Sequence, residues 1–335
     1  MNEKNTSVAG YRQAVLSAQE VWQRLQESSL EHHSNYLAMY SSWYQGIVLD
    51  PGFMLLPVDD HLVHRGDGIF EAFKCVQGKV YLLERHLDRL ERSADLIDLK
   101  LPMQRILLRE VILETISAAQ ARDCLVRLFV SRGPGDFTPS PSSCLGSQLY
   151  IIVTTQARTK EEKYKAGCSL VSSRVPIKPD FLANVKSCNY LPNVLMEKEI
   201  EERGADFAVG LDEQGYLTEG PTENLGLISK GNEFLVPDFE RTLKGITVVR
   251  MMELAEELVQ EGLLQGVRQA KISARDLLQA REVMMFGTTF DVLPVVSFEN
   301  QSLGQGRPGP VFERFLQLLL QDQEQGQGVL TPLPR

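Results

Sequence analysis

Apolar side chains recur along this chain with two periods, one typical of helices and the other of strands. Residues spaced three and four apart repeat in six segments, as in helices with one apolar face. Shorter apolar runs bounded by turn residues predict strands, and the two runs around Gln77-Gly78 predict a β-hairpin. The predicted helices span 11–28, 84–97, 103–121, 191–204, 247–261 and 311–320, and the predicted strands span 53–56, 69–76, 79–83, 125–131, 148–155, 168–174 and 283–286.

The helix predicted from 191 to 204 follows a segment that carries little charge. Its apolar residues Leu191, Val194, Leu195 and Ile200 share one face. Gly204 stands where a left-handed residue ends a helix. We therefore expect an amphipathic helix here, followed by two short strands around the turn at 212–215.

Helices and strands alternate along most of the chain, which predicts a mixed α/β (α+β) fold. A length of 335 residues is enough for two domains with separate cores. The charged and polar segment from 155 to 166 predicts the link between them. We expect a helical N-terminal extension over 1–48, a first domain over 49–156, a link over 157–165, a second domain over 166–322 and a tail over 323–335.

Composition and charge narrow the possible partners. Hydrophobic residues at 43% and charged residues at 24% are typical of a globular protein. A net charge of −9 argues against nucleic acid as a partner. We expect no signal peptide and no membrane-spanning segment, because no apolar run is long enough for either. The five scattered cysteines form no CxxC pair and predict a cytoplasmic protein.

The segment from 59 to 71 contains His61 and His64 among several acidic residues. Two histidines at this spacing could begin a metal site, but a zinc site needs three or four ligands. No further cluster of suitable residues follows downstream. We therefore expect no metal.

Lys186 stands in a stretch without any other charged residue from 181 to 196. Most lysines are solvated at the surface, which is the ordinary alternative here. In an apolar pocket, however, the ammonium form is disfavoured, and the free amine can form a Schiff base with a carbonyl. Chemistry with pyridoxal 5'-phosphate (PLP) needs such a lysine, an acid beside the pyridine nitrogen and a cradle for the phosphate.

Several short motifs together resemble the class IV (fold type IV) PLP enzymes. This family includes branched-chain aminotransferases, D-amino acid aminotransferases and aminodeoxychorismate lyases. The resemblance runs from about residue 60 to 298 and implies a small α/β domain, a larger β-barrel-like domain with flanking helices, and a homodimer. The motifs are Lys186-Ser187-x-Asn189-x-Leu191, Gly204-Ala205, Thr218-Glu219-Gly220 and Glu223-Asn224-Leu225.

The resemblance also implies roles for individual residues at the cofactor. Lys186 would hold PLP covalently and then act as acid and base at the substrate's α-carbon. Glu219 would stay ionised against the pyridine nitrogen, with Glu223 as the rival acid. Tyr190 would border the phenolic oxygen, although the branched-chain enzymes have one more residue between the lysine and the tyrosine.

A second group of residues would bind the phosphate. Arg89 lies in His86-Leu87-Asp88-Arg89-Leu90, which is similar to the family's H-x-x-R-L motif; the alternative is a solvated helix charge. Ile246 and Thr247 follow a glycine at a predicted helix start, where free N–H groups favour an anion. Thr288 would complete this group by resemblance.

By resemblance, Phe70, Glu71, Arg132 and Thr289 are the candidates for binding the substrate. Phe70 could equally be an ordinary core residue of its strand. Arg132 begins a turn-rich loop that corresponds to a carboxylate-binding loop of the family. The bacterial D-amino acid enzymes carry an Arg-x-His motif in this loop, and residues 137–139 read Phe-Thr-Pro instead.

The resemblance predicts a PLP-dependent aminotransferase that moves an amino group between an amino acid, branched-chain or D, and a 2-oxo acid. One alternative is an aminodeoxychorismate lyase that releases pyruvate with the same lysine. Another is a non-catalytic PLP-binding protein. The presence of Lys186, Glu219, Arg89 and Thr288 in one chain argues against loss of catalysis.

Overall fold

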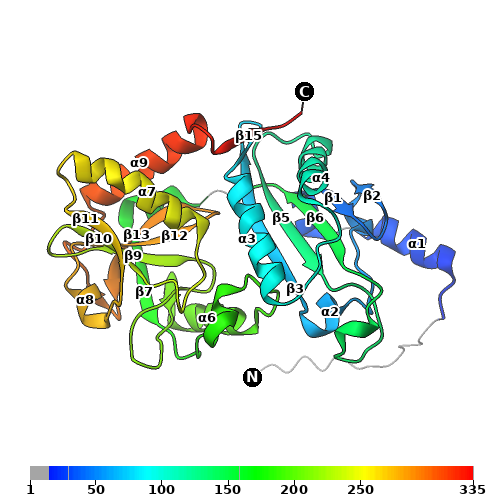
Figure 1. Ribbon diagram of the computed structural model, residues 1–335, viewed down its shortest axis with the longest axis horizontal. Helices are drawn as coiled ribbons and strands as arrows, with labels where there is room; N and C mark the ends of the chain where they lie inside the picture. Colours follow the sequence, from blue (N-terminus) through cyan, green and yellow to red (C-terminus); the bar gives the residue numbers. More distant parts are fainter. Residues whose placement is uncertain (1–14, 29, 158, 335) are drawn as a thin grey trace, which may run out of the picture.

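The computed structural model describes residues 15–28, 30–157 and 159–334. Two β-sheets, each covered by helices, lie side by side, and helix α3 (Leu83–Leu96) runs between them (Figure 1). The arrangement confirms the mixed α/β fold expected from the order of the elements.

In the described residues the first sheet has seven strands, in the order β15-β4-β3-β5-β6-β1-β2. Helix α3 and helix α4 (Arg105–Ala118) bury Leu87, Leu90 and Ile112 in its core. The hairpin turn is as predicted, since Gln77 and Gly78 both have positive φ, as a two-residue turn of the I′ type requires. The strands are β1 (Tyr36–Ser41), β2 (Gly46–Val48), β3 (Gly68–Val76), β4 (Lys79–Tyr81), β5 (Cys124–Ser131), β6 (Gln148–Thr154) and β15 (Leu330–Pro332).

The second sheet has eight strands in the described part of the chain, in the order β11-β10-β9-β12-β13-β7-β8, with β14 paired to β13. Helix α7 (Ile246–Gln260) and helix α9 (Pro310–Gln325) share one apolar core with it. A second core includes residues of α8 (Ala274–Leu278). The strands are β7 (Cys168–Ser172), β8 (Phe207–Val209), β9 (Asn224–Ile228), β10 (Glu233–Pro237), β11 (Gly266–Ala270), β12 (Glu282–Gly287), β13 (Asp291–Phe298) and β14 (Gln301–Ser302).

The two ends of the chain differ from the expectation. Strands β1 and β2 lie inside the range 1–48, where only helix was expected, and β15 lies inside the expected tail. Residues 53–56 were predicted as a strand, but residue 53 ends the short 3-10 helix η2 (Pro51–Phe53) and residues 54–56 follow it without regular secondary structure. Strand β1 forms because it pairs with β6, more than a hundred residues away, and such pairing leaves no local signal.

The predicted N-terminal helix is present as α1 (Ala18–Glu27). Residues 11–14 of the predicted range lie outside the described residues. The helix starts where Ser17 accepts a hydrogen bond from the backbone N–H of Glu20, whose carboxylate accepts one from Ser17 in return. The Trp22 ring lies 6.3 Å from that of Phe53, and this contact joins the helix to the first domain.

Helix α6 (Leu191–Arg203) ends at Gly204 in the left-handed conformation, as predicted. Met196 and Ile200 are its buried residues. Leu191, Val194 and Leu195 are 69%, 57% and 46% exposed. The apolar face read from the sequence is therefore largely on the surface, whereas an apolar helix face normally packs against the body of the protein.

An ion pair and a hydrogen bond join the two domains on one side of the contact between them. Arg85 of α3 binds Glu253 of α7 through two hydrogen bonds of 2.7 and 2.8 Å, and such a bidentate pair fixes orientation as well as distance. The Tyr81 hydroxyl of β4 donates to the Asp322 carboxylate of α9 at 2.5 Å. Arg250 of α7 binds the same carboxylate at 2.9 and 2.7 Å, a pair within the second domain that orients Asp322 toward Tyr81.

Candidate active site

A cavity of about 430 Å³ lies between the two domains. Strands β3 and β5 supply its wall from the first domain. The segments 178–193, 219–224, 243–247 and 286–289 supply the rest. The predicted site residues that line it are Lys186, Glu219, Arg89, Ile246, Thr247, Thr288, Tyr190, Phe70 and Thr289; Glu71 and Arg132 are not among the lining residues.

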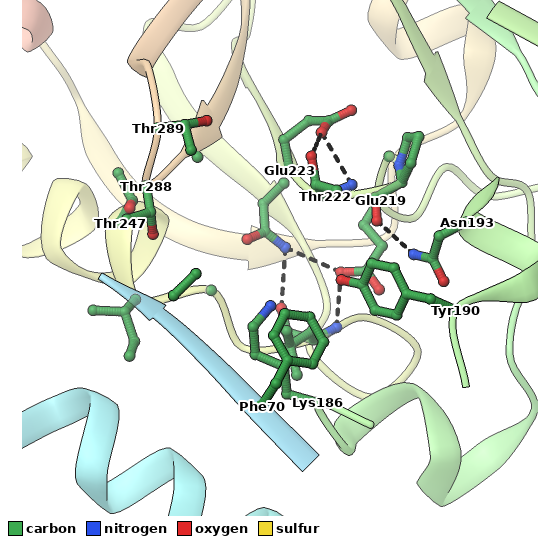
Figure 2. A pocket seen from close by; sticks show the side chains of 18 of the residues that line it. Phe70, Lys186, Tyr190, Asn193, Glu219, Thr222, Glu223, Thr247, Thr288 and Thr289 are labelled. Carbon is green, nitrogen blue, oxygen red and sulfur yellow. Dashed lines mark hydrogen bonds between the residues drawn. The ribbon is translucent and has the colours of Figure 1, made fainter. Parts of the chain in front are cut away.

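Lys186 is held by a segment that pairs with strand β3. The Phe70 N–H donates to the Lys186 carbonyl at 2.9 Å, and the Lys186 N–H donates to Ser93 Oγ at 3.3 Å. Its Nζ lies 4.4 Å from the centre of the Phe70 ring (Figure 2). Burial, together with the positive charge of Arg89, lowers the pKa of the Lys186 ammonium to about 8. Much more of the amine is therefore unprotonated near neutral pH than in an exposed lysine.

Glu219 lines the same cavity, near Tyr190 (Figure 2). Its Oε2 accepts hydrogen bonds from the Leu243 N–H at 2.9 Å and from Asn224 Nδ2 at 3.3 Å. Burial nevertheless raises the pKa of Glu219 to about 8. The carboxyl was expected to be ionised, but among these protein groups alone it favours the neutral form. A cation bound beside it would lower this pKa and restore the charge.

Glu223, the rival acid, also lines the cavity, but its carboxylate is hydrogen-bonded to the neighbouring residue of its own turn. Its Oε2 accepts hydrogen bonds from the Thr222 N–H at 3.0 Å and from Thr222 Oγ1 at 2.6 Å. Burial raises its pKa to about 7. A side chain at Gly220 would come within 2.2 Å of Glu223 Oε1, so the close turn requires glycine there.

The start of helix α7 and the turn after β12 form another wall of the cavity. Thr247, Thr288 and Thr289 gather there, apart from Glu219 and Tyr190 (Figure 2). No side chain of the described residues caps the helix at Gly245, so its first N–H groups are available to an anion. These groups and the threonine hydroxyls are the kinds of donor that hold a phosphate.

Arg89 reaches this cavity from helix α3 and is oriented by Glu71. Arg89 Nε and Nη2 each donate to the Glu71 carboxylate at 2.7 Å, and His86 Nδ1 lies 2.7 Å from the same group. Burial alone would raise the pKa of Glu71, but Arg89 and His86 outweigh it and lower this pKa to about 2. The expectation that Glu71 lines the substrate pocket is therefore wrong. Neighbouring strand residues face opposite sides of a sheet, and Phe70 takes the cavity side.

Arg132 is also placed away from the cavity, contrary to expectation. Its guanidinium binds the Asp67 carboxylate at 3.0 to 3.2 Å and the backbone carbonyls of Ile97 and Asp98 at 3.0 and 2.7 Å. These contacts use its donors to hold the loop after β5 against the end of α3. Within the described chain, Arg132 stabilises the first domain and does not reach a ligand in this cavity.

Two cationic residues of the cavity were missed from the sequence. Lys178 Nζ lies 4.7 Å from the centre of the Tyr190 ring, and Arg127 Nη1 donates to Thr154 Oγ1 at 3.2 Å. Strand alternation could have revealed Arg127, because it shares a face of β5 with Phe129, the residue opposite Phe70. Lys178 follows an irregular loop and leaves no periodic signal.

These residues fit PLP, whose aldehyde, ring nitrogen and phosphate need different partners. Lys186 offers a partly neutral amine and Glu219 an acid inside the cavity. Arg89, Thr247, Thr288 and the α7 start offer donors for a phosphate. For the described residues, no group of three or more His, Cys, Asp and Glu side chains is arranged to hold a metal ion. No helix in this part of the chain has the length and apolar character to cross a membrane.

The sequence model of the family described as Amino-transferase class IV matches residues 68–298. The chain belongs to this family. It is 38% identical over 323 residues to the chloroplastic D-amino-acid transaminase of Arabidopsis thaliana. The matched residues make up 96% of this chain and 85% of the Arabidopsis protein.

Solved structures of this family agree with the fold. The branched-chain amino acid aminotransferase of Escherichia coli superposes with a TM-score of 0.81 at 25% identity, covering 90% of this chain and 100% of that one. The 4-amino-4-deoxychorismate lyase of Pseudomonas aeruginosa superposes with a TM-score of 0.69 at 25% identity, and the match covers 81% of this chain and 96% of the lyase chain. The class IV chain described here is therefore a transaminase, and the lyase is a more distant neighbour.

Proposed function

We propose that this transaminase uses PLP bound to Lys186 to transfer the amino group of a D-amino acid to a 2-oxo acid. The observation that carries the proposal is the position of Lys186, whose weakly basic amine faces a cavity that also holds Glu219. The preference for a D-amino acid rests on the 38% identity to the Arabidopsis D-amino-acid transaminase. A branched-chain donor remains the second candidate, supported by the fold of the E. coli enzyme.

Each residue has a separate task in this proposal. PLP, when bound, supplies the electron sink that stabilises negative charge at the substrate's α-carbon. Lys186 removes the proton from that carbon and returns a proton on the cofactor side. Glu219 carries the negative charge that keeps the ring nitrogen protonated. Phe70 and Tyr190, whose ring centres lie 5.1 Å apart, exclude water from the reacting face.

In this proposal the start of helix α7 would hold the phosphate. Arg89 would contribute the guanidinium that Glu71 orients. The hydroxyls of Thr247 and Thr288 and the N–H groups after Gly245 would donate hydrogen bonds to it. Thr289, at the exposed end of the same turn, lies beside the substrate.

Two experiments test the proposal: one detects the cofactor on Lys186, and the other compares turnover of D- and L-amino acids. The purified protein should be yellow, and borohydride should fix the cofactor to Lys186. Lys186→Ala should lose the adduct, whereas Lys230→Ala, a control at an exposed lysine, should keep it. Incubation with D-alanine and 2-oxoglutarate should give pyruvate and D-glutamate. A colourless protein, or turnover of L-amino acids only, would contradict the corresponding part of the proposal.

We also propose that the protein is a homodimer. The support is an exposed apolar surface on and beside helix α6, formed by Phe181, Leu182, Leu191, Val194 and Leu195. Exposed apolar patches of this kind mark contacts with other protein surfaces. Light scattering should give twice the chain mass. Leu191→Glu with Leu195→Glu should shift the protein to a monomer, while Leu107→Glu, an exposed leucine on α4, should not.

We propose a cytoplasmic location, and the support is that all five cysteines are free thiols. The Arabidopsis relative is described as chloroplastic, so an organelle is the competing location. Fractionation of the native cells with an antibody to the protein distinguishes the two.

A further inference from the structure

The cavity contains more positive charge than the cofactor needs. Arg89 is neutralised by Glu71, but Lys178 and Arg127 make no ion pair within the described chain. A transaminase must also hold the α-carboxylate that every amino acid and every 2-oxo acid carries. Arg132, the residue expected to do so, is bound to Asp67 outside the cavity. One of the two unpaired cations is therefore available for this carboxylate.

Lys178 is held on an irregular but well-anchored loop between β7 and α6. The Ser173 N–H at the loop's start donates to the Val209 carbonyl at 2.8 Å. Ile177 packs so closely on Gly210 that a Cβ there would lie 2.6 Å from Ile177 Cγ2. Prolines at 176 and 179 restrict the backbone on both sides of Lys178. These contacts fix where the side chain starts and reduce the entropy that it loses on binding a ligand.

A chain of ring contacts connects Lys178 to the reactive amine. Its Nζ lies 4.7 Å from the centre of the Tyr190 ring, and that ring lies 5.1 Å from Phe70. The Phe70 ring in turn lies 4.4 Å from Lys186 Nζ. Lys178 is close enough to Lys186 for its charge to lower the pKa of the Lys186 ammonium. The two amines therefore face the same aromatic pair.

The environment of Lys178 favours an anionic ligand. The ammonium is half-buried, and burial lowers its pKa, although the charge of Glu219 partly offsets this effect. A cation removed from water without a counter-ion costs free energy, and a bound carboxylate compensates for that cost. Arg127 is more exposed and donates to Thr154 on strand β6, so it lies at the outer wall of the cavity.

We propose that Lys178 binds the α-carboxylate of the amino acid and of the 2-oxo acid. The inference rests on the proposed function and names the residue that orients the substrate in it. A carboxylate bound to Lys178 would lie beside the Phe70–Tyr190 pair, which Lys186 also contacts, and the α-carbon next to it would then be within reach of Lys186.

Two amino-group donors that differ only in the carboxylate test the contact between Lys178 and the substrate. D-alanine carries the carboxylate, and D-alaninamide has the same shape without the charge. Lys178→Met should lower kcat/KM for D-alanine about 30-fold or more, since removal of one partner of a buried charged hydrogen bond costs that much. The same variant should change kcat/KM for D-alaninamide by less than about threefold. Lys178→Arg should recover part of the preference for D-alanine, and Arg127→Met should keep it.

A binding measurement provides a readout that does not depend on turnover. Titration calorimetry with propionate and with propionamide should show that wild-type protein prefers the carboxylate. Lys178→Met should lose this preference, and Arg127→Met should retain it. The yellow colour and the circular dichroism of each variant check that the fold and the cofactor are intact.

The outcomes separate failure of the inference from failure of the proposed function. If Lys178→Met loses equal activity with D-alanine and D-alaninamide, Lys178 does not bind the carboxylate and the inference fails. If Arg127→Met is the variant that loses discrimination, Arg127 holds that carboxylate and the inference also fails. If wild-type protein turns over no D-amino acid at all, the proposed function fails, while the propionate titration still decides the role of Lys178.

Discussion

Replacement of Glu71 by glutamine should show how much one buried anion contributes to both stability and cofactor binding. Glu71 is 1% exposed and contacts two basic side chains, Arg89 and His86. Glutamine keeps the shape but removes the charge, so the Arg89 guanidinium remains buried beside a neutral amide. Arg89 also loses the second acceptor oxygen that now fixes the plane of its guanidinium.

The pKa of Glu71 gives the expected magnitude. A carboxyl whose pKa falls from 4.5 to about 2 on folding contributes about 3 kcal/mol to stability at neutral pH. Removal of one partner from a buried pair costs about 3 to 5 kcal/mol, which agrees. Because the folded pKa is depressed, this contribution is present above pH 4.5 and is lost as the pH falls toward 2. At pH 3 about 1 kcal/mol should remain.

The assay is urea denaturation followed by far-UV circular dichroism at pH 7 and at pH 3. Glu71→Gln should unfold with a free energy about 3 kcal/mol below wild type at pH 7, and the difference should shrink at pH 3. Glu84→Gln is the control on helix α3, which carries Arg89, since Glu84 is half-exposed and its bonds to Arg105 and Arg109 contribute less than about 1 kcal/mol. A loss below about 1 kcal/mol at pH 7, or an unchanged gap at pH 3, refutes the reasoning.

Three further changes test other parts of the site. In Gly245→Ala the new Cβ would lie 1.7 Å from Asn224 Oδ1, so we expect a loss of about 1 to 3 kcal/mol in urea unfolding and weaker binding of PLP by fluorescence titration. Arg132→Met should lower the unfolding temperature, because Asp67 keeps only its contact with His61, yet it should leave KM for the amino acid within about threefold. A large rise in KM would mean that Arg132 does bind the substrate. The acylation rate of Lys186 in cofactor-free protein should rise with pH through a midpoint near 8, because only the neutral amine reacts; a midpoint near 10.5 would contradict its burial.

Local chemistry predicted the parts of the site that depend on neighbours in sequence. Lys186 stood out because its surroundings carry no other charge, and the structure gives it a lowered pKa. The glycine before Ile246 predicted a helix start, and α7 begins there. The turn at Gln77-Gly78 needed only two residues that tolerate positive φ. Such features depend on residues that are close together in the chain, so they can be predicted from a single sequence.

Features that depend on distant partners were missed or misassigned. Phe70 and Glu71 were both expected at the substrate, although neighbouring residues of a strand cannot face the same side. Arg132 was assigned to a ligand because its partner Asp67, far away in sequence, could not be foreseen. Lys178 reaches the cavity only through the course of an irregular loop, which no periodicity describes.

The return of the chain to its first sheet constrains how the molecule can be divided and how it can move. Strand β15 completes that sheet beside β4, so the polypeptide passes between the halves once after β6 and again after α9 (Figure 1). A fragment that stops at residue 156 would leave the outer edge of β4 with unpaired amides, and such edges promote aggregation. In the intact enzyme, two covalent crossings restrict how the halves can rotate against each other, so we expect any opening of the cavity between them to be a hinge motion about these crossings.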